Sequence, residues 1–390
     1  MDDILLRIYN EAWPTWRATT VYLVWVSFQA LLYMYAPGPV GEGLPCIDGP
    51  DQGVRLKYKY NGQFAWGVTL VMVAVLHFTG VFRLTELASM FGPMQTVCNL
   101  YTYLLILALY LHARWTNTLE RRTDSPVYDY FMGPKLNPRI GNFDVKFFHE
   151  LRPGIMHWFF TTIGFAIKQY ERDGAVTMPM LLVCFYHLCF VNACYKGEQC
   201  VPMSMDIIYE KFGWMLGWLD LVCVPFVFPL QAYYLYVIPP FEHPWYITSL
   251  LLFAHCFAYY MFDTSNAQKD YFRANEKKDQ HHIPYGFPNL PWSKLDNPNY
   301  LPTKRGTKLL LDGWWKYARH CNYAGDIIMS WTWGLTCGVS SYFPFAYTTY
   351  LTPLLLHRER RDNIECKRKY GEDWDKYCEA VPYRIFPYIY

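Results

Sequence analysis

Two polar blocks near the end of the chain carry the residues best suited to binding a large planar ligand. The blocks are GWWKYARHCNYAGD (313–326) and LLLHRERRDNIECKRKYGEDWDKYC (354–378), and both are rich in aromatic and basic residues. One apolar segment separates them, so a ligand that both blocks contact must lie at a membrane surface that both can reach. The arrangement predicts a cofactor site.

A further basic segment, DTSNAQKDYFR (263–273), follows an apolar run. Its Asn266, Lys269 and Arg273 are three and four residues apart, which places them on one face of a helix. Two cations beyond a membrane helix are typical of a pair that faces solvent or lipid phosphates. The alternative, which the pattern leaves open, is that they bind a phosphate group of a ligand.

Acidic residues form the second candidate constellation. Asp206, Glu210, Gly213, Gly217 and Asp220 are four, three, four and three residues apart. This spacing predicts one helical face about 21 Å long. A carboxylate at membrane depth is costly, so Asp220 is expected to face a protein-lined cavity. The alternative is a structural carboxylate that pairs with an interior Arg, His or Tyr.

The composition places the chain among integral membrane proteins. Hydrophobic residues make up 53% of its 390 residues and charged residues only 17%, and the apolar residues occur in long runs. A net charge of +2 without a long basic run excludes nucleic acid as a partner. The first 16 residues lack the pattern of a cleavable signal, so the first apolar run is expected to serve as the targeting signal. There is no CxxC pair, so we expect no metal site and no disulfide framework.

The apolar runs predict an all-α, polytopic membrane protein. A crossing needs about 20 residues, whereas the polar stretch 131–154 carries the turn signals Asn137-Pro138 and Pro153-Gly154 and is expected to be an ordered loop. We expect about ten transmembrane or re-entrant helices. The clearest runs are Thr19–Tyr35, Phe64–Phe82, Leu100–Leu111, Ile155–Ile167, Met178–Ala193 and Ile247–Phe262.

The apolar stretch Ile327–Leu356 must return to the side from which it started if its two flanks build one site. Its 30 residues are too few for two full crossings of about 20 residues each. We therefore expect two short or re-entrant helices with a break near residues 340–344, and this break must be buried in protein to be tolerated. Lys and Arg are dense in both flanks, so the site is expected to face the cytosol.

The last helix would by its pattern alone be an interfacial amphipathic helix, with Asp362, Cys366, Tyr370 and Tyr377 at helical spacing. Its sequence HRERRDNIECKRKYGEDWDKYC, together with GWWKYARHCNYAGD, resembles the paired C-terminal signatures of the sterol reductase family. The loop block LNPRIGNFDVKFFHELRPG and the DxxxxxKDxFR pattern from Asp263 resemble the same family. The four blocks stand in the family's order, and the resemblance covers essentially the whole chain.

The resemblance implies a multi-pass enzyme of the endoplasmic reticulum membrane that reduces a sterol double bond at C-7, C-14 or C-24(28) with NADPH. It implies one domain over residues 1–390, in which residues 1–262 hold the N-terminal helices and the acids of a sterol cavity. Residues 263–390 would bind NADPH. A sterol substrate and the lipid bilayer are then the expected partners.

Matching residues by motif implies a dinucleotide site in the last third of the chain. Lys and Arg suit the phosphates, including the 2′-phosphate that distinguishes NADPH. Aromatic rings offer planar surfaces, and Asn322 and Asp362 suit hydrogen bonds to ribose or carboxamide. There is no GxGxxG after a strand, so a Rossmann site is not expected, and we assign His320 to packing or hydrogen bonding. The implied cofactor residues are Lys269, Arg273, Leu310, Trp315, Asn322, Tyr323, Asp362, Cys366, Lys369, Tyr370 and Tyr377.

The position of the sterol double bond is indicated by VNACYKGEQ (191–199), which with DTSNAQKD and FPNLPW (287–292) is most similar to the C-24(28) branch of the family. The C-14 branch carries a histidine and paired acids where this chain has Tyr195-Lys196-Gly197-Glu198. GWWKYARHCNYAGD, however, is closer to the C-14 and C-7 pattern, which keeps those two substrates open.

Reduction of an isolated alkene needs a proton that yields the more substituted carbocation, coupled to hydride delivery. For a C-24(28) bond, the proton would go to C-28 and the hydride to C-24. The proton donor must be a carboxyl group that burial keeps neutral by raising its pKa. The sterol would lie among aromatic residues of an intramembrane cavity. The candidate donors are Glu198 first, Asp206 second and Asp220, with Tyr209 or Tyr234 as a relay.

Two other functions remain open. RHxNYxGD followed by a basic, tyrosine-containing helix also resembles membrane methyltransferases that act on isoprenylcysteine and use S-adenosylmethionine, although that match covers only the last third of the chain. A non-catalytic sterol-binding scaffold is the second. Binding of NADPH would exclude the first, and sterol turnover would exclude the second.

Overall fold

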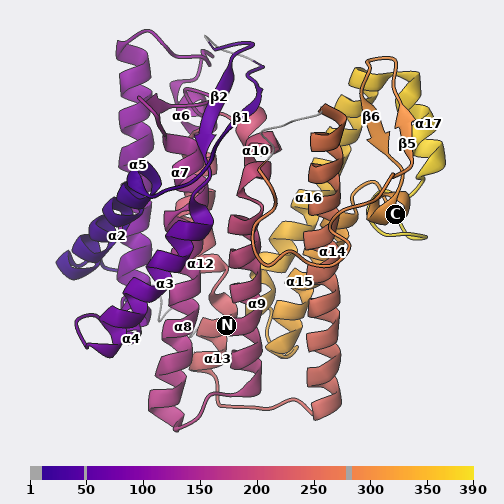
Figure 1. Cartoon of the computed structure of the whole chain (residues 1–390). Coiled ribbons are helices and arrows are strands. Elements are labelled where there is room, and N and C mark those ends of the chain that lie inside the picture. Colours follow the sequence, from indigo (N-terminus) through magenta and orange to yellow (C-terminus); the bar gives the residue numbers. More distant parts are fainter. Residues whose placement is uncertain (1–10, 48–50, 278–282) are drawn as a thin grey trace. The chain divides into compact units, whose positions relative to one another are not determined.

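The computed structural model describes residues 11–47, 51–277 and 283–390 (Figure 1). The chain is mostly helical, as the apolar runs predict. In these ranges six short strands, which the all-α prediction did not include, pair antiparallel in three two-stranded sheets. The chain divides into two compact units, each with its own helices.

The first unit comprises Met1–Val176 and Cys194–Pro239. Its helix α8, Pro153–Asp173, is buried along most of its length and ends at Gly174, whose φ of 73° is left-handed. Gly164 lets α4 (Leu84–Ser89) approach α8 closely, because a Cβ at this position would lie 2.6 Å from the carbonyl oxygen of Leu84. The unit also contains α2 (Trp16–Tyr35), α3 (Gly62–Phe78), α5 (Phe91–Trp115), α6 (Pro126–Met132), α7 (Val145–Leu151), β1 (Val40–Pro45), β2 (Arg55–Lys59), β3 (Arg139–Ile140) and β4 (Phe143–Asp144).

Residues 198–237 do not form the single helix that the spacing of the acids predicted. Asp206 lies in one short helix, whereas Gly213 is extended, with φ −117° and ψ −173°, and precedes another. A Cβ on Gly213 would lie 2.2 Å from the amide nitrogen of Gly133. This contact with a distant loop is absent from any local spacing pattern, and the prediction of one acidic face was wrong. The pieces are a 3-10 helix (Glu198–Met203), α10 (Met205–Ile208), α11 (Trp214–Trp218), a π-helical turn (Leu219–Cys223), α12 (Val224–Val227) and α13 (Leu230–Val237).

The second unit comprises Thr177–Ala193 and Pro240–Tyr390. Its longest helix, α14 (Trp245–Lys277), runs without interruption through an apolar run and the basic segment that follows. α15 (Cys321–Thr336) packs against α14 at Gly325, where a Cβ would lie 2.8 Å from the carbonyl oxygen of Ala258. The unit also contains most of α9 (Met178–Lys196), β5 (Tyr300–Pro302), β6 (Lys308–Leu310), a 3-10 turn (Gly313–Lys316), α16 (Ala346–Tyr370) and α17 (Glu372–Ala380).

α15 and α16 confirm the predicted pair of helices with a break near residues 340–344. They pack against each other, and the Thr348 hydroxyl donates a hydrogen bond to the carbonyl of Ser330 at 2.7 Å. α16 continues beyond the apolar stretch into the second polar block. The break is buried only in part, because Phe343 and Pro344 are buried whereas Tyr342 is 60% exposed. The expected burial of the break is therefore met by its last residues and not by its first ones.

Five helical segments in the described ranges are long and apolar enough to cross a membrane. This supports a multi-pass helical membrane protein. The segments are α2, α5, α9, the run Trp214–Val237 and α14.

Candidate functional site

A cavity of about 200 Å³ lies in the second unit, where α14, β6, the 3-10 turn, α16 and α17 meet. It draws its lining from three segments that are far apart in the sequence. The lining residues are Lys269, Phe272, Arg273, Leu309, Leu310, Trp315, Arg319, Asp362, Cys366, Lys369, Tyr370, Trp374 and Tyr377.

The structure brings most of the predicted cofactor residues to this cavity. Of the predicted cofactor residues, only Asn322 and Tyr323 are outside the cavity lining. The ring of Tyr323 stacks on that of His320, with centroids 4.8 Å apart, and Nε2 of His320 is 3.5 Å from Oδ2 of Asp362. Asn322 donates a hydrogen bond to the side chain of Asn266 at 3.1 Å.

α14 supplies two cations one turn apart. The ammonium of Lys269 lies 4.2 Å from the ring centroid of Trp315, a cation–π distance. The indole of Trp315 is in turn fixed by a hydrogen bond to the carbonyl of Ser265, at 2.9 Å. Arg273 donates to the carbonyl of Lys308 at 3.0 Å, which ties α14 to β6. Both cations are therefore held in place by neighbouring elements.

Three stacked aromatic rings form another part of the cavity lining. Tyr370 ends α16, and the rings of Trp374 and Tyr377 follow it on α17. Successive centroids are 6.3 Å and 5.1 Å apart. Gly371 makes the sharp junction between the two helices possible, with a positive φ of 58°. Burial raises the pKa of the Tyr377 hydroxyl, so it stays neutral and able to donate a hydrogen bond.

Arg319 also lines the cavity, although it was not among the predicted residues. Its side chain donates to the sulfur of Cys378 and, at 3.5 Å, to the carbonyl of Pro382, whereas its Nε is buried and makes no hydrogen bond within the described chain. Its backbone amide donates to the carbonyl of Tyr383 at 3.0 Å, and the next amide, of His320, donates to that of Arg384 at 2.8 Å. The segment after α17 thus holds Arg319 against the cavity.

His320 is a neutral imidazole in this environment. Burial lowers its pKa to about 4, and the nearby carboxylate of Asp362 opposes the shift without reversing it. A neutral ring forms no ion pair with Asp362, whose Oδ2 accepts a hydrogen bond from the Cys366 thiol at 3.7 Å. The stacking of His320 on Tyr323 agrees with the packing or hydrogen-bonding role predicted for this histidine.

The charge of the lining favours an anionic ligand. The lining contains four cations, Lys269, Arg273, Arg319 and Lys369, and one carboxylate, that of Asp362, although Arg273 also pairs with Glu276 at 3.0 Å. Guanidinium groups and ammonium groups of this kind bind phosphates. The sequence prediction missed Phe272, Leu309, Arg319 and Trp374. Two of these could have been found from the sequence, since Arg319 directly precedes His320 in the quoted block and Trp374 lies one helical turn before Tyr377.

Glu198, the first candidate for the proton donor, is bound to a buried arginine. The side chains of Arg152 and Glu198 are 0% and 3% exposed, and their charged groups are in direct contact. Glu198 also accepts a hydrogen bond from the amide of Gly62 at 2.7 Å. Burial raises the pKa of Glu198, while Arg152 and the Gly62 amide oppose that rise because both favour the carboxylate form. This is the environment of a structural counter-ion.

Asp206 and Tyr209 lie around the short helix α10. Asp206 is half-buried and Tyr209 is 38% exposed. The ammonium of Lys146 is buried beneath them and donates to the carbonyls of Asp206, Ile207 and Glu210 at 2.9–3.0 Å. Burial lowers the pKa of Lys146 to about 8, and surrounding carboxylates oppose this. The lysine therefore secures the turn that carries both candidates.

Asp220 lies in a different environment, inside the π-helical turn of the run Trp214–Val237. Its residue is only 6% exposed. α8 approaches it closely at Gly154, where a Cβ would lie 2.1 Å from the Asp220 carbonyl oxygen. Single π-helical turns are frequent at functional sites. Tyr234, the other candidate relay, is buried on α13.

Comparison with known proteins gives the family. The model of the ergosterol biosynthesis ERG4/ERG24 family matches residues 1–390. The chain is 41% identical to a Delta(14)-sterol reductase of Methylotuvimicrobium alcaliphilum over 377 residues, which cover 97% of this chain and 84% of the relative. It is 39% identical to the Delta(14)-sterol reductase of Dictyostelium discoideum, over 97% and 79% of the two chains. It is 36% identical to the Delta(24(24(1)))-sterol reductase erg4A of Aspergillus fumigatus, over 99% and 82%. The chain therefore belongs to the ERG4/ERG24 family of ergosterol biosynthesis and is a membrane sterol reductase.

Proposed function

We propose that this protein reduces the C-24(28) double bond of a sterol with NADPH, and that the cavity of the second unit holds the cofactor. The cofactor assignment rests on a lining that contains four cations and one carboxylate, together with a column of aromatic rings. An anionic ligand with planar rings suits such a lining.

The residues of the cavity fit part of NADPH in their charge and in the planar surfaces of their rings. The buried Arg319, whose Nε makes no hydrogen bond among the described residues, joins Lys269 and Arg273 as a partner for phosphate oxygens. The volume of about 200 Å³ is smaller than the roughly 300–1,000 Å³ of typical small-molecule sites. The cavity would therefore enclose one part of the dinucleotide rather than all of it.

Each group of residues has a task in this proposal. When bound, NADPH would supply the hydride. Lys269, Arg273 and Arg319 would bind its phosphates, and the 2′-phosphate would give the preference over NADH. Asp362, which lies near His320, would accept a hydrogen bond from a ribose hydroxyl. The remaining predicted residues, Leu310, Trp315, Asn322, Tyr323, Cys366, Lys369, Tyr370 and Tyr377, would complete the site.

For the proton, we propose Asp220 ahead of Asp206 and Glu198. Asp220 is buried inside a candidate membrane span, where an acidic side chain is costly and marks a functional position. Glu198 is the counter-ion of Arg152, and a proton on it would leave that guanidinium without its charge partner. Tyr209, being 38% exposed, suits a relay less well than the buried Tyr234. The proton would go to C-28 and the hydride to C-24, which leaves a saturated bond between these two carbons and NADP⁺.

The choice of double bond rests on the residues 191–199, which resemble the C-24(28) branch, and on the relative from Aspergillus fumigatus named for the same bond. Reduction of the C-14 bond is the second candidate. It is favoured by the 41% and 39% identities to two relatives named Delta(14)-sterol reductases. We further propose an endoplasmic reticulum location with the cofactor site facing the cytosol, because Lys and Arg are dense in both of its flanks.

Product analysis tests this proposal. The purified protein is incubated with NADPH and a mixture of C-24(28), C-14 and C-7 unsaturated sterols, and the products are identified by mass spectrometry. We expect the C-24(28) substrate to be consumed and to gain two hydrogens. NADPH deuterated at the transferable position should add one deuterium at C-24.

A matched pair of variants separates the cofactor assignment from the substrate assignment. Lys269→Ala with Arg273→Ala should abolish reduction at low NADPH, whereas Lys316→Ala with Arg305→Ala removes two exposed cations outside the cavity and should leave it intact. Consumption of the C-14 substrate alone would replace the proposed bond. NADPH binding without turnover of any sterol would overturn the enzyme assignment in favour of a scaffold.

A further inference from the structure

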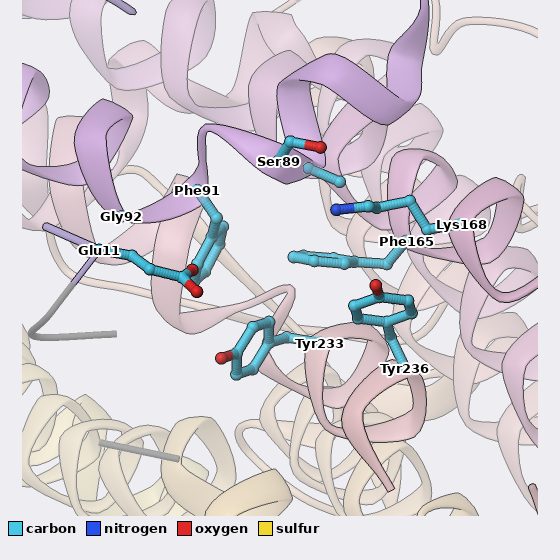
Figure 2. A pocket seen from close by; sticks show the side chains of 9 residues that line it. Glu11, Ser89, Phe91, Gly92, Phe165, Lys168, Tyr233 and Tyr236 are labelled. Atoms are coloured by element: carbon cyan, nitrogen blue, oxygen red, sulfur yellow. The ribbon is translucent and has the colours of Figure 1, made fainter. Parts of the chain in front are cut away.

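A second cavity, of about 170 Å³, lies in the first unit and contains none of the residues discussed for sterol reduction. Figure 2 shows its lining from close by. It is formed by the end of α4, the beginning of α5 and the last turns of α8 and α13. α5 and the run Trp214–Val237 are candidate membrane spans. A cavity at the beginning of one span and the end of the other lies at the boundary between membrane and water.

The floor of this cavity is aromatic. Phe91 and Phe165 are 5% and 1% exposed, and Tyr233 is 5% exposed. The rings of Phe91 and Tyr233 stack with centroids 5.3 Å apart, and Phe165 meets the ring of Tyr236 at 5.8 Å. The faces of aromatic rings attract a cation, above all a quaternary ammonium group.

Two opposite charges approach the cavity from different sides. In Figure 2 the carboxylate of Glu11 and the ammonium of Lys168 both point into the space in front of the rings. The nitrogen of Lys168 lies 5.3 Å from the ring centroid of Tyr236. An anion alone would meet the carboxylate, and a cation alone would meet the ammonium. A ligand that carries both charges matches both side chains.

We propose that this cavity binds the zwitterionic headgroup of a phospholipid. Lys168 would bind the phosphate. Glu11 and the aromatic floor would bind the choline or ethanolamine ammonium group. The acyl chains would extend along the apolar outer surface of the spans, which fits a cavity at the boundary of the membrane. The site does not depend on the sterol or the cofactor.

The test measures binding of short-chain lipids to the full chain in a maltoside detergent by isothermal titration calorimetry. Dihexanoylphosphatidylcholine should bind saturably, and dihexanoylphosphatidylglycerol, which lacks the ammonium group, roughly tenfold more weakly. Glu11→Gln should weaken the choline lipid and leave the glycerol lipid unchanged. Lys168→Gln should weaken both lipids. Free phosphocholine should compete with the choline lipid.

Two controls keep the result specific. Glu171→Gln and Arg114→Gln remove exposed charges of the same unit that do not line the cavity, and they should leave both affinities unchanged. Equal binding of the two lipids to the native protein would overturn the proposal. So would affinities that neither cavity substitution changes. If a cavity variant unfolds, Ser89→Trp, placed at the exposed rim, should block the choline lipid by filling the space.

Discussion

Replacing Glu198 by Gln distinguishes a structural ion pair from a proton donor. The Arg152 and Glu198 side chains are 0% and 3% exposed, so the substitution leaves a buried guanidinium without its counter-charge. Breaking a buried pair from one side destabilises proteins by about 3–5 kcal/mol. Unfolding entropy is about 2.1 cal/mol/K per residue, which for 390 residues gives roughly 0.8 kcal/mol/K. The melting temperature of Glu198→Gln should therefore fall by about 4–6 °C.

Thermal denaturation of the purified protein in detergent, followed by circular dichroism, measures this shift. Arg152→Met combined with Glu198→Gln removes the uncompensated charge and should lose less stability than the two single changes added together. Glu365→Gln is the control, because it breaks an exposed pair with Arg368 and should cost less than about 1 kcal/mol.

Sterol turnover by Glu198→Gln decides whether Glu198 is a structural counter-ion or the proton donor. If Glu198 is the counter-ion, Glu198→Gln should keep a measurable rate of sterol reduction per folded molecule at temperatures below its lowered transition. A variant with the native melting temperature and no turnover would refute this reasoning and would make Glu198 the proton donor.

Three further predictions concern the cavity of the second unit. Lys269→Ala with Arg273→Ala should weaken NADPH far more than NADH in equilibrium titrations, and equal weakening would separate these cations from the 2′-phosphate. Arg319→Met should raise the Kd for NADPH by roughly tenfold, since it removes a buried guanidinium from the lining; an unchanged Kd would assign Arg319 to structure alone. Burial lowers the pKa of His320 to about 4, so between pH 6.5 and 4 the unfolded chain binds more protons than the folded one and stability falls as the pH falls, by up to about 3 kcal/mol from this residue. His320→Asn should reduce the difference between melting temperatures at pH 7 and pH 4.5, and an equal difference in both proteins would contradict the assignment.

Much of the helical framework could be predicted from the apolar runs. The run Thr19–Tyr35 became α2, Trp16–Tyr35, and the run Met178–Ala193 became α9, Met178–Lys196. The boundaries of these helices can be predicted from the sequence because the membrane sets the length and polarity of a span. The motifs of the C-terminal third likewise led to residues that the fold gathers around one cavity.

Contacts between distant segments could not be predicted in the same way. The acids after residue 205 have helical spacing, but the approach of Gly213 to Gly133 interrupts the helix. The pairing of Glu198 with Arg152 joins residues 46 positions apart and gives the carboxylate a charge partner that the sequence does not indicate. Neither contact leaves a periodic signal, because both depend on how separate segments pack.

The length of α14 links the cofactor cavity to the lipid. Its 33 residues extend about 50 Å, whereas the hydrocarbon core of a bilayer is about 30 Å thick. Its last turns, which carry Lys269 and Arg273, therefore project beyond the hydrocarbon as part of the same helix that crosses it. A thinner or thicker bilayer changes the tilt of such a helix through hydrophobic mismatch. A change in the acyl-chain length of the surrounding lipid should therefore also move Lys269 and Arg273, because both lie on this helix.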